Sequence, residues 1–166
     1  MQKMKATLIL ENGMTFAGRS IGSGEERICE MVFNTSMTGY QEILTDPSYA
    51  GQGIVMSYPL IGNYGVNHED NESSRPWAEA FIVRHLARRG SNFRCEDGLD
   101  SYLKQFHITG IEGVDTRALT RILRSQGTMN GMITCAEHFS VQECLERIRA
   151  YRVEGTVERV TRREPQ

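Results

Sequence analysis

Residues 5–18 read KATLILENGMTFAG, with two strand-like runs on either side of the pair Asn12-Gly13. An Asn-Gly pair tolerates the positive φ angles of a tight primed turn, so it is a strong local signal for a hairpin. The stretch therefore predicts two antiparallel strands at 5–10 and 14–18, joined at Asn12 and Gly13.

Further strands are expected where bulky apolar residues gather. These runs lie at 28–34, 54–58, 80–83 and 108–111. Strands that follow one another and strands separated by helical patterns both occur in the chain. This order is typical of a mixed α/β domain with hairpin and crossover pairings.

Three helices are predicted from apolar spacing and capping residues. The first begins near Asp97 or Asp100 and buries residues at i, i+3, i+4 and i+7, namely Leu99, Tyr102, Leu103 and Phe106. The second spans 116–126 between the N-cap Asp115 and the stop Gly127, with three inward residues, Leu119, Ile122 and Leu123. In the third, Ser140 and Glu143 have capping-box spacing, and the buried stripe is Val141, Cys144, Leu145 and Ile148.

Length and composition indicate one soluble globular domain. The 166 residues are 39% hydrophobic and 24% charged, and no apolar run approaches a membrane span. We assign 1–151 to the domain and 152–166, which turns polar, to a connector. The start of the chain lacks the pattern of an export signal, so a cytoplasmic location is expected.

Charge argues against nucleic acid as a partner. The net charge is −2 and the pI about 6.1, and the basic cluster of Arg159, Arg162 and Arg163 is interpreted as a solvated terminal segment. No membrane partner is expected either. The polar segment 63–77 is long for a compact domain, which favours a role as an interface.

The four cysteines form no C-x-x-C pair, which argues against a zinc knuckle, a redox motif or a disulfide framework. Cys29 and Cys144 fall within strand and helix patterns and are expected in the core. Cys95 follows Arg94, which lowers thiol pKa values, but no glycine elbow surrounds it. A nucleophilic Cys95 stays open as a minor alternative.

No metal site or catalytic residue is predicted. His68, Glu69, Asp70 and Glu72 are adjacent but match no ligand spacing, so a solvated loop is the preferred interpretation. The isolated histidines, His85, His107 and His138, are interpreted as structural. The glycines form no phosphate-binding loop, and no cofactor is expected in this chain.

The most distinctive stretch is 33–49, FNTSMTGYQEILTDPSY. Its small polar residues are poor core material, and Thr38 with Gln41 can cap a short helix. Asp46-Pro47 favours a turn that holds Ser48 at an exposed position.

This stretch resembles the signature of the small subunit of carbamoyl-phosphate synthetase. Three more segments occur in the order found in that family, at 58–67, 91–94 and 114–120. The resemblance covers about residues 5–134.

The resemblance implies a three-layer β/β/α domain of the swivelling type with mixed sheets. It also implies a partner, the large ATP-using and magnesium-using subunit, which receives ammonia from glutamine for arginine or pyrimidine biosynthesis. In the family, glutamine is hydrolysed by a carboxy-terminal class I amidotransferase domain with G-x-C-x-G and H-x-E motifs. Neither motif occurs in this sequence, so we expect the chain alone to be inactive and that domain to be a further partner.

One binding role is carried over from the family, because the serine of T-D-P-S-Y reaches into the glutamine pocket. The matching residue is Ser48, with a local turn-capping serine as the alternative. Residues expected at an interface are Met37, Gly39, Tyr40, Asn63, Tyr64 and Asn67. Two other functions stay open: a stand-alone interaction or regulatory module, and an independent thiol or metal hydrolase.

Overall fold

The computed structural model describes residues 4–67, 69–88 and 97–153. The strands are β1 (Lys5–Leu10), β2 (Thr15–Gly22), β3 (Arg27–Asn34), β4 (Gln52–Met56), β5 (Leu60–Ile61), β6 (Ala80–Val83), β7 (His85–Leu86), β8 (Thr109–Glu112) and β9 (Met129–Thr134). The helices are α1 (Tyr40–Thr45), the 3₁₀ turn η1 (Pro47–Tyr49), α2 (Leu99–Gln105), α3 (Thr116–Gln126) and α4 (Val141–Ala150).

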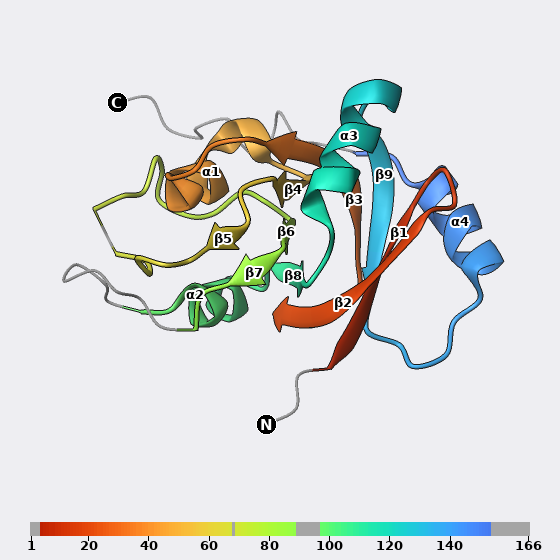
Figure 1. Ribbon diagram of the computed structural model, residues 1–166, viewed down its shortest axis with the longest axis horizontal. Helices are drawn as coiled ribbons and strands as arrows, with labels where there is room; N and C mark the ends of the chain where they lie inside the picture. Colours follow the sequence, from red (N-terminus) through yellow and green to blue (C-terminus); the bar gives the residue numbers. More distant parts are fainter. Residues whose placement is uncertain (1–3, 68, 89–96, 154–166) are drawn as a thin grey trace, which may run out of the picture.

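Seven strands form a closed barrel in the order β1-β2-β8-β6-β4-β3-β9 (Figure 1). Three neighbouring pairs are parallel: β3 with β4, β4 with β6, and β6 with β8. Strand β1 pairs antiparallel with both β2 and β9. The short strands β5 and β7 form a separate parallel pair. The expected mixed α/β domain with hairpin and crossover pairings is thereby confirmed.

Successive side chains of a strand point to opposite faces, and here both faces of the barrel wall are apolar. In β4, Val55 joins the cluster inside the barrel, while Ile54 and Met56 join a cluster outside it. Helix α3 contributes Leu119 and Leu123 to the inner cluster, so one face of this helix belongs to the barrel core.

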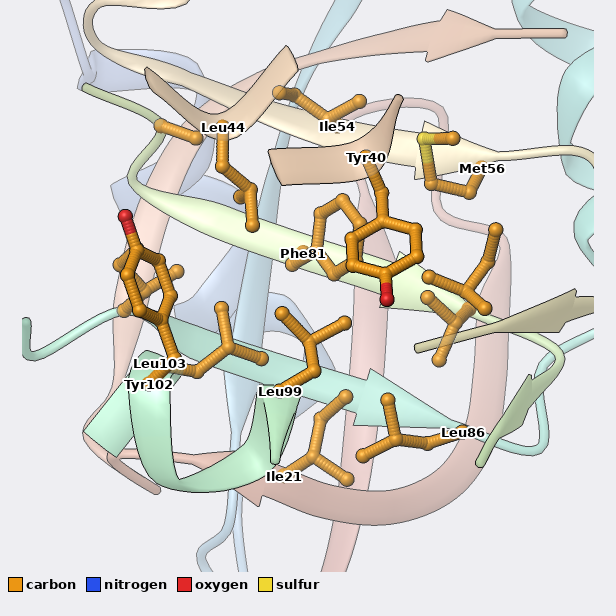
Figure 2. Close-up of a cluster of buried hydrophobic side chains, with 14 of the residues drawn as sticks. Ile21, Tyr40, Leu44, Ile54, Met56, Phe81, Leu86, Leu99, Tyr102 and Leu103 are labelled. Carbon is orange, nitrogen blue, oxygen red and sulfur yellow. The ribbon is translucent and has the colours of Figure 1, made fainter. Parts of the chain in front are cut away.

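The outer cluster is covered by α1 and α2. Figure 2 shows Tyr40 and Leu44 from α1 and Leu99, Tyr102 and Leu103 from α2 converging on Phe81 of β6. A third cluster forms where Cys144, Leu145 and Ile148 of α4 pack on Ile9 and Met132. The core positions predicted for Cys29 and Cys144 are confirmed, since both are buried.

The opening hairpin is confirmed, but its turn differs from the one predicted. Gly13 has φ 90° and donates its N–H to the carbonyl of Leu10 at 2.8 Å, while Asn12 is outside the positive-φ region. The strands are thus joined by a three-residue loop with one left-handed glycine instead of a primed turn. The Asn12 side chain instead accepts from the N–H of Met14 at 3.0 Å.

The N-caps predicted for α3 and α4 are confirmed. Asp115 accepts from the N–H of Ala118, and Ser140 accepts from that of Glu143. The start predicted for α2, near Asp97 or Asp100, is confirmed, since the helix begins at Leu99. Neither aspartate caps it: the N-cap is Gly98, and Asp100 instead accepts from the N–H of Gly22 at 2.8 Å.

Two residues predicted on the buried faces of helices are instead exposed. Phe106 lies at the end of α2 and Val141 at the start of α4, with 38% and 40% of their surface accessible. Apolar spacing identifies a stripe along a helix, but the stripe is buried only as far as the barrel extends beneath it. None of the helices within 4–67, 69–88 and 97–153 has the length and the apolar content of a membrane span.

Candidate functional site

The carboxyl ends of β3, β4, β6 and β8 lie at one edge of the barrel because these strands are parallel. The segments that leave β3 and β4 at this edge form the candidate site. We call residues 34–49 and 57–77, apart from His68, the loop cluster. It contains all six predicted interface residues and Ser48.

Two tyrosines hold the two halves of the loop cluster together. The rings of Tyr40 and Tyr64 stack with centroids 4.4 Å apart and an interplanar angle of 20°. The Tyr40 hydroxyl donates to the carbonyl of Gly65 at 2.6 Å, and the Gly39 N–H donates to the Tyr64 hydroxyl at 2.6 Å. Gly39 has φ 79°, a conformation that glycine adopts without steric cost.

Gln41 makes a second connection between the halves. Its side-chain oxygen accepts from the N–H of Asn67 at 3.0 Å, and its amide nitrogen donates to the carbonyl of Asn67 and to Asn71 Oδ1. The helix cap predicted from Thr38 and Gln41 is therefore wrong, because the N-cap of α1 is Gly39 and no side chain caps the helix.

Thr45 anchors the later part of the polar segment. Its hydroxyl donates to the Gln41 carbonyl and accepts from the N–H of Glu72 at 2.9 Å, and its carbonyl accepts from Ser73 Oγ at 2.7 Å. Ser73 Oγ in turn accepts from Trp77 Nε1. The segment is long and lacks regular strands, yet these bonds fix it against α1.

Ser48 lies in η1 and is exposed, as predicted. The turn is capped by Asp46, whose carboxylate accepts from the Ser48 N–H at 2.8 Å. The Tyr49 hydroxyl accepts from Asn34 Nδ2 at 3.0 Å, which ties the turn to the end of β3. Since Asp46 supplies the capping oxygen, the Ser48 hydroxyl is not needed for this cap.

The six predicted interface residues differ in exposure. Met37, at 66%, and Asn63 are exposed, and Gly39, Tyr64 and Asn67 are partly buried. Tyr40 is 1% exposed, so its predicted place as a contact residue needs correction. Its ring supports the loop cluster from beneath.

One polar atom of the loop cluster is buried without a partner. Glu42 Oε2, in the first turn of α1, has no hydrogen bond within the described part of the chain. A β-carbon added to Gly39 would lie 3.6 Å from this oxygen, so the unpaired atom is adjacent to the Gly39 turn. A buried carboxylate oxygen without a donor is unfavourable.

The two cysteines buried in the described part of the chain are unfavourable as nucleophiles. Burial raises the pKa of the Cys29 thiol, and burial also raises the pKa of Cys144, which opposes formation of a nucleophilic thiolate. Burial raises the pKa of Tyr64, partly offset by backbone hydrogen bonds from Gly39 and Tyr40, so its hydroxyl stays neutral. Cys95 and His68 lie outside the described residues.

The other candidate ligands are dispersed or used locally. Asp70 accepts from Asn67 Nδ2 at 2.7 Å, and His107 lies 3.1 Å from Glu25. His85 and His138 are exposed. Across 4–67, 69–88 and 97–153 no three His, Cys, Asp or Glu side chains are grouped to hold a metal ion.

Comparison with known proteins identifies relatives of the chain. The family model described as the carbamoyl-phosphate synthase small chain, CPSase domain, matches residues 8–133. The carbamoyl phosphate synthase small chain of Clostridium perfringens is 52% identical over 148 residues, which is 89% of this chain and 42% of that protein.

Two further relatives show similar coverage. The small chain of Bacillus caldolyticus is 52% identical over 147 residues, or 89% of this chain and 40% of its own length. The pyrimidine-specific small chain of Bacillus subtilis is 47% identical over 145 residues, or 87% and 40%. The chain thus spans about two fifths of the length of these relatives.

Proposed function

The chain belongs to the carbamoyl-phosphate synthase small-chain family, and we propose that it docks a large, ATP-using synthetase subunit and supplies one edge of a glutamine site. In this proposal ammonia released from glutamine passes to the large subunit in the cytoplasm, for arginine or pyrimidine biosynthesis. The proposal includes the three-layer β/β/α swivelling architecture expected from the family.

The observation that carries the proposal is the position of Ser48. The serine is exposed on a turn that Asp46 and Tyr49 fix to the barrel edge. A hydroxyl held in this way is available to a substrate bound by an adjoining domain. We assign it one hydrogen bond to glutamine, and we place hydrolysis itself in the carboxy-terminal amidotransferase domain that the family implies.

The loop cluster is the proposed docking surface. It offers the exposed Met37 and Asn63 on a backbone held by buried bonds, so little conformational entropy is lost when a partner binds.

Association with the large subunit tests the docking role. A small subunit carrying this chain is mixed with the large subunit, and the dissociation constant is measured by sedimentation. Met37→Asp should weaken association, because it places a charge within the proposed contact. The control Met14→Asp changes a 44% exposed methionine in the β1–β2 turn and should have no effect. Lack of association of the unmodified subunit would favour the stand-alone module instead.

A further inference from the structure

A cavity of about 520 Å³ lies beside α3, and three of its lining residues, Thr35, Ser57 and Pro59, belong to the loop cluster. Five of its lining residues come from one face of α3: Thr116, Arg117, Thr120, Arg121 and Arg124. The others, Thr35, Ser57, Pro59 and Arg84, follow β3, β4 and β6. The cavity is therefore at the edge where the parallel strands end.

The lining is strongly basic. It contains four arginines and no acidic residue. Arg84 lies 3.6 Å from Asp115, but Arg117, Arg121 and Arg124 have no ion pair within the described ranges. Arg117 and Arg121 are four residues apart on one helix, where like charges repel. An anion in the cavity would relieve that repulsion.

Two buried hydroxyls in the lining have no partner. Thr116 is 1% exposed and Thr120 is 6% exposed, and the Oγ1 atom of each lacks a hydrogen bond within the part of the chain that is described. Leaving a buried polar group unpaired costs folding free energy. Thr116 is also the first residue of α3, where the helix dipole favours negative charge.

We propose that this cavity binds a phosphate-bearing small molecule. Four guanidinium groups and two hydroxyls exceed what the two oxygens of one carboxylate can accept, whereas a phosphoryl group offers three oxygens and more charge. The cavity volume is within the range of small-molecule sites and larger than a bare phosphate requires. The site is separate from the proposed role of Ser48, because none of its lining residues lies in α1 or η1.

Calorimetric titration of the chain with inorganic phosphate and with pyrophosphate tests the proposal, with sodium chloride at matched ionic strength as reference. Both phosphates should bind, pyrophosphate more tightly, and chloride should not. Arg121→Gln removes one exposed guanidinium and should weaken pyrophosphate binding about tenfold, the scale of one charged hydrogen bond. The control Arg149→Gln, on the exposed side of α4, should leave binding unchanged.

Thr120→Val gives a second readout that does not depend on charge. Valine keeps the shape and removes the unpaired hydroxyl, so the melting temperature without ligand should stay the same or rise, while pyrophosphate binding weakens. Equal binding of pyrophosphate by the unmodified chain and Arg121→Gln would overturn the proposal. So would heat signals from phosphate no larger than those from chloride.

Discussion

The hydroxyl of Tyr64 accepts a hydrogen bond of 2.6 Å from the backbone N–H of Gly39. The bond connects the turn before α1 to the loop after β5, and the same tyrosine stacks on Tyr40. Tyr64 is thus a support of the loop cluster as well as a candidate contact. Its replacement by alanine would alter both roles, so a smaller change is needed to separate them.

Tyr64→Phe keeps the stacked ring and removes only the acceptor for the Gly39 N–H. We expect the free energy of unfolding to fall by about 0.5–1.5 kcal/mol, and the Gly39 amide to exchange faster with solvent. Denaturant unfolding and amide hydrogen exchange measure the two effects. The matched control is Tyr58→Phe at a 37% exposed tyrosine. An unchanged exchange rate at Gly39 would contradict the role given to this bond.

Gln41→Glu tests the second connection. Gln41 is 1% exposed and donates to two oxygens, the Asn67 carbonyl and Asn71 Oδ1, which a carboxylate would repel. We expect a loss of at least about 2 kcal/mol at pH 7. Burial should raise the pKa of the introduced carboxyl in the folded state, so the loss should shrink as pH falls through that pKa.

Urea unfolding from about pH 4, near the ordinary Glu pKa, up to about pH 8 covers a raised pKa and measures this dependence. The control is Gln126→Glu, because Gln126 is exposed and acts as an acceptor for Asn12 Nδ2. A carboxylate retains that acceptor, and little change is expected. If Gln41→Glu lowers the free energy of unfolding by the same amount at every pH, the Asn67 carbonyl and Asn71 Oδ1 do not face this side chain.

The strands and helices with local signals could be predicted from the sequence, because hairpin turns, caps and apolar runs are properties of neighbouring residues. Strand β9 was not predicted. Its pattern is interrupted by Asn130 and Gly131, and it is defined by pairing with β1 and β3, which are distant in sequence. The short pair β5 and β7 depends in the same way on distant pairing.

The candidate site shows the same limit. The exposed position of Ser48 follows from the local Asp46-Pro47 turn and could be predicted. The bonds from Tyr40 to Gly65 and from Gln41 to Asn67 join residues that are 25 and 26 positions apart, and no local pattern specifies them. For this reason the sequence marked Tyr40 as a contact, whereas the fold buries it.

The close packing around Gly22 in the barrel can be tested by adding a single β-carbon there. A β-carbon at Gly22, which has φ 69°, would lie 2.2 Å from the Ile108 carbonyl oxygen. Gly22→Ala should lower the free energy of unfolding by about 2–5 kcal/mol, the sum of backbone strain and overpacking. Thermal and denaturant unfolding measure the loss. The control Gly98→Ala has open space around the new carbon and φ −80°. Its weaker N-cap preference should be roughly offset by the lower entropy of the unfolded chain, so little change is expected.

Stability should also depend on alkaline pH through Tyr102. Burial raises the pKa of this tyrosine from 10.0 to about 12. The unfolded chain therefore loses the phenolic proton first, and stability present below pH 10 should decline as pH rises toward 12. Tyr102→Phe should flatten this decline, measured by unfolding at pH 9 to 12, about the span of the shift. The same slope in the variant would assign the decline to other groups.

The Ser48→Ala substitution, made in a full small subunit paired with its large subunit, tests the central claim most directly. Loss of one neutral hydrogen bond costs about 0.5–1.5 kcal/mol, so the glutamine KM should rise roughly 2- to 13-fold while kcat changes less. Ser101→Ala, at an exposed serine on α2, is the control and should retain normal kinetics. A glutamine KM in Ser48→Ala equal to that of the unmodified enzyme would contradict the account and leave Ser48 as a turn residue only.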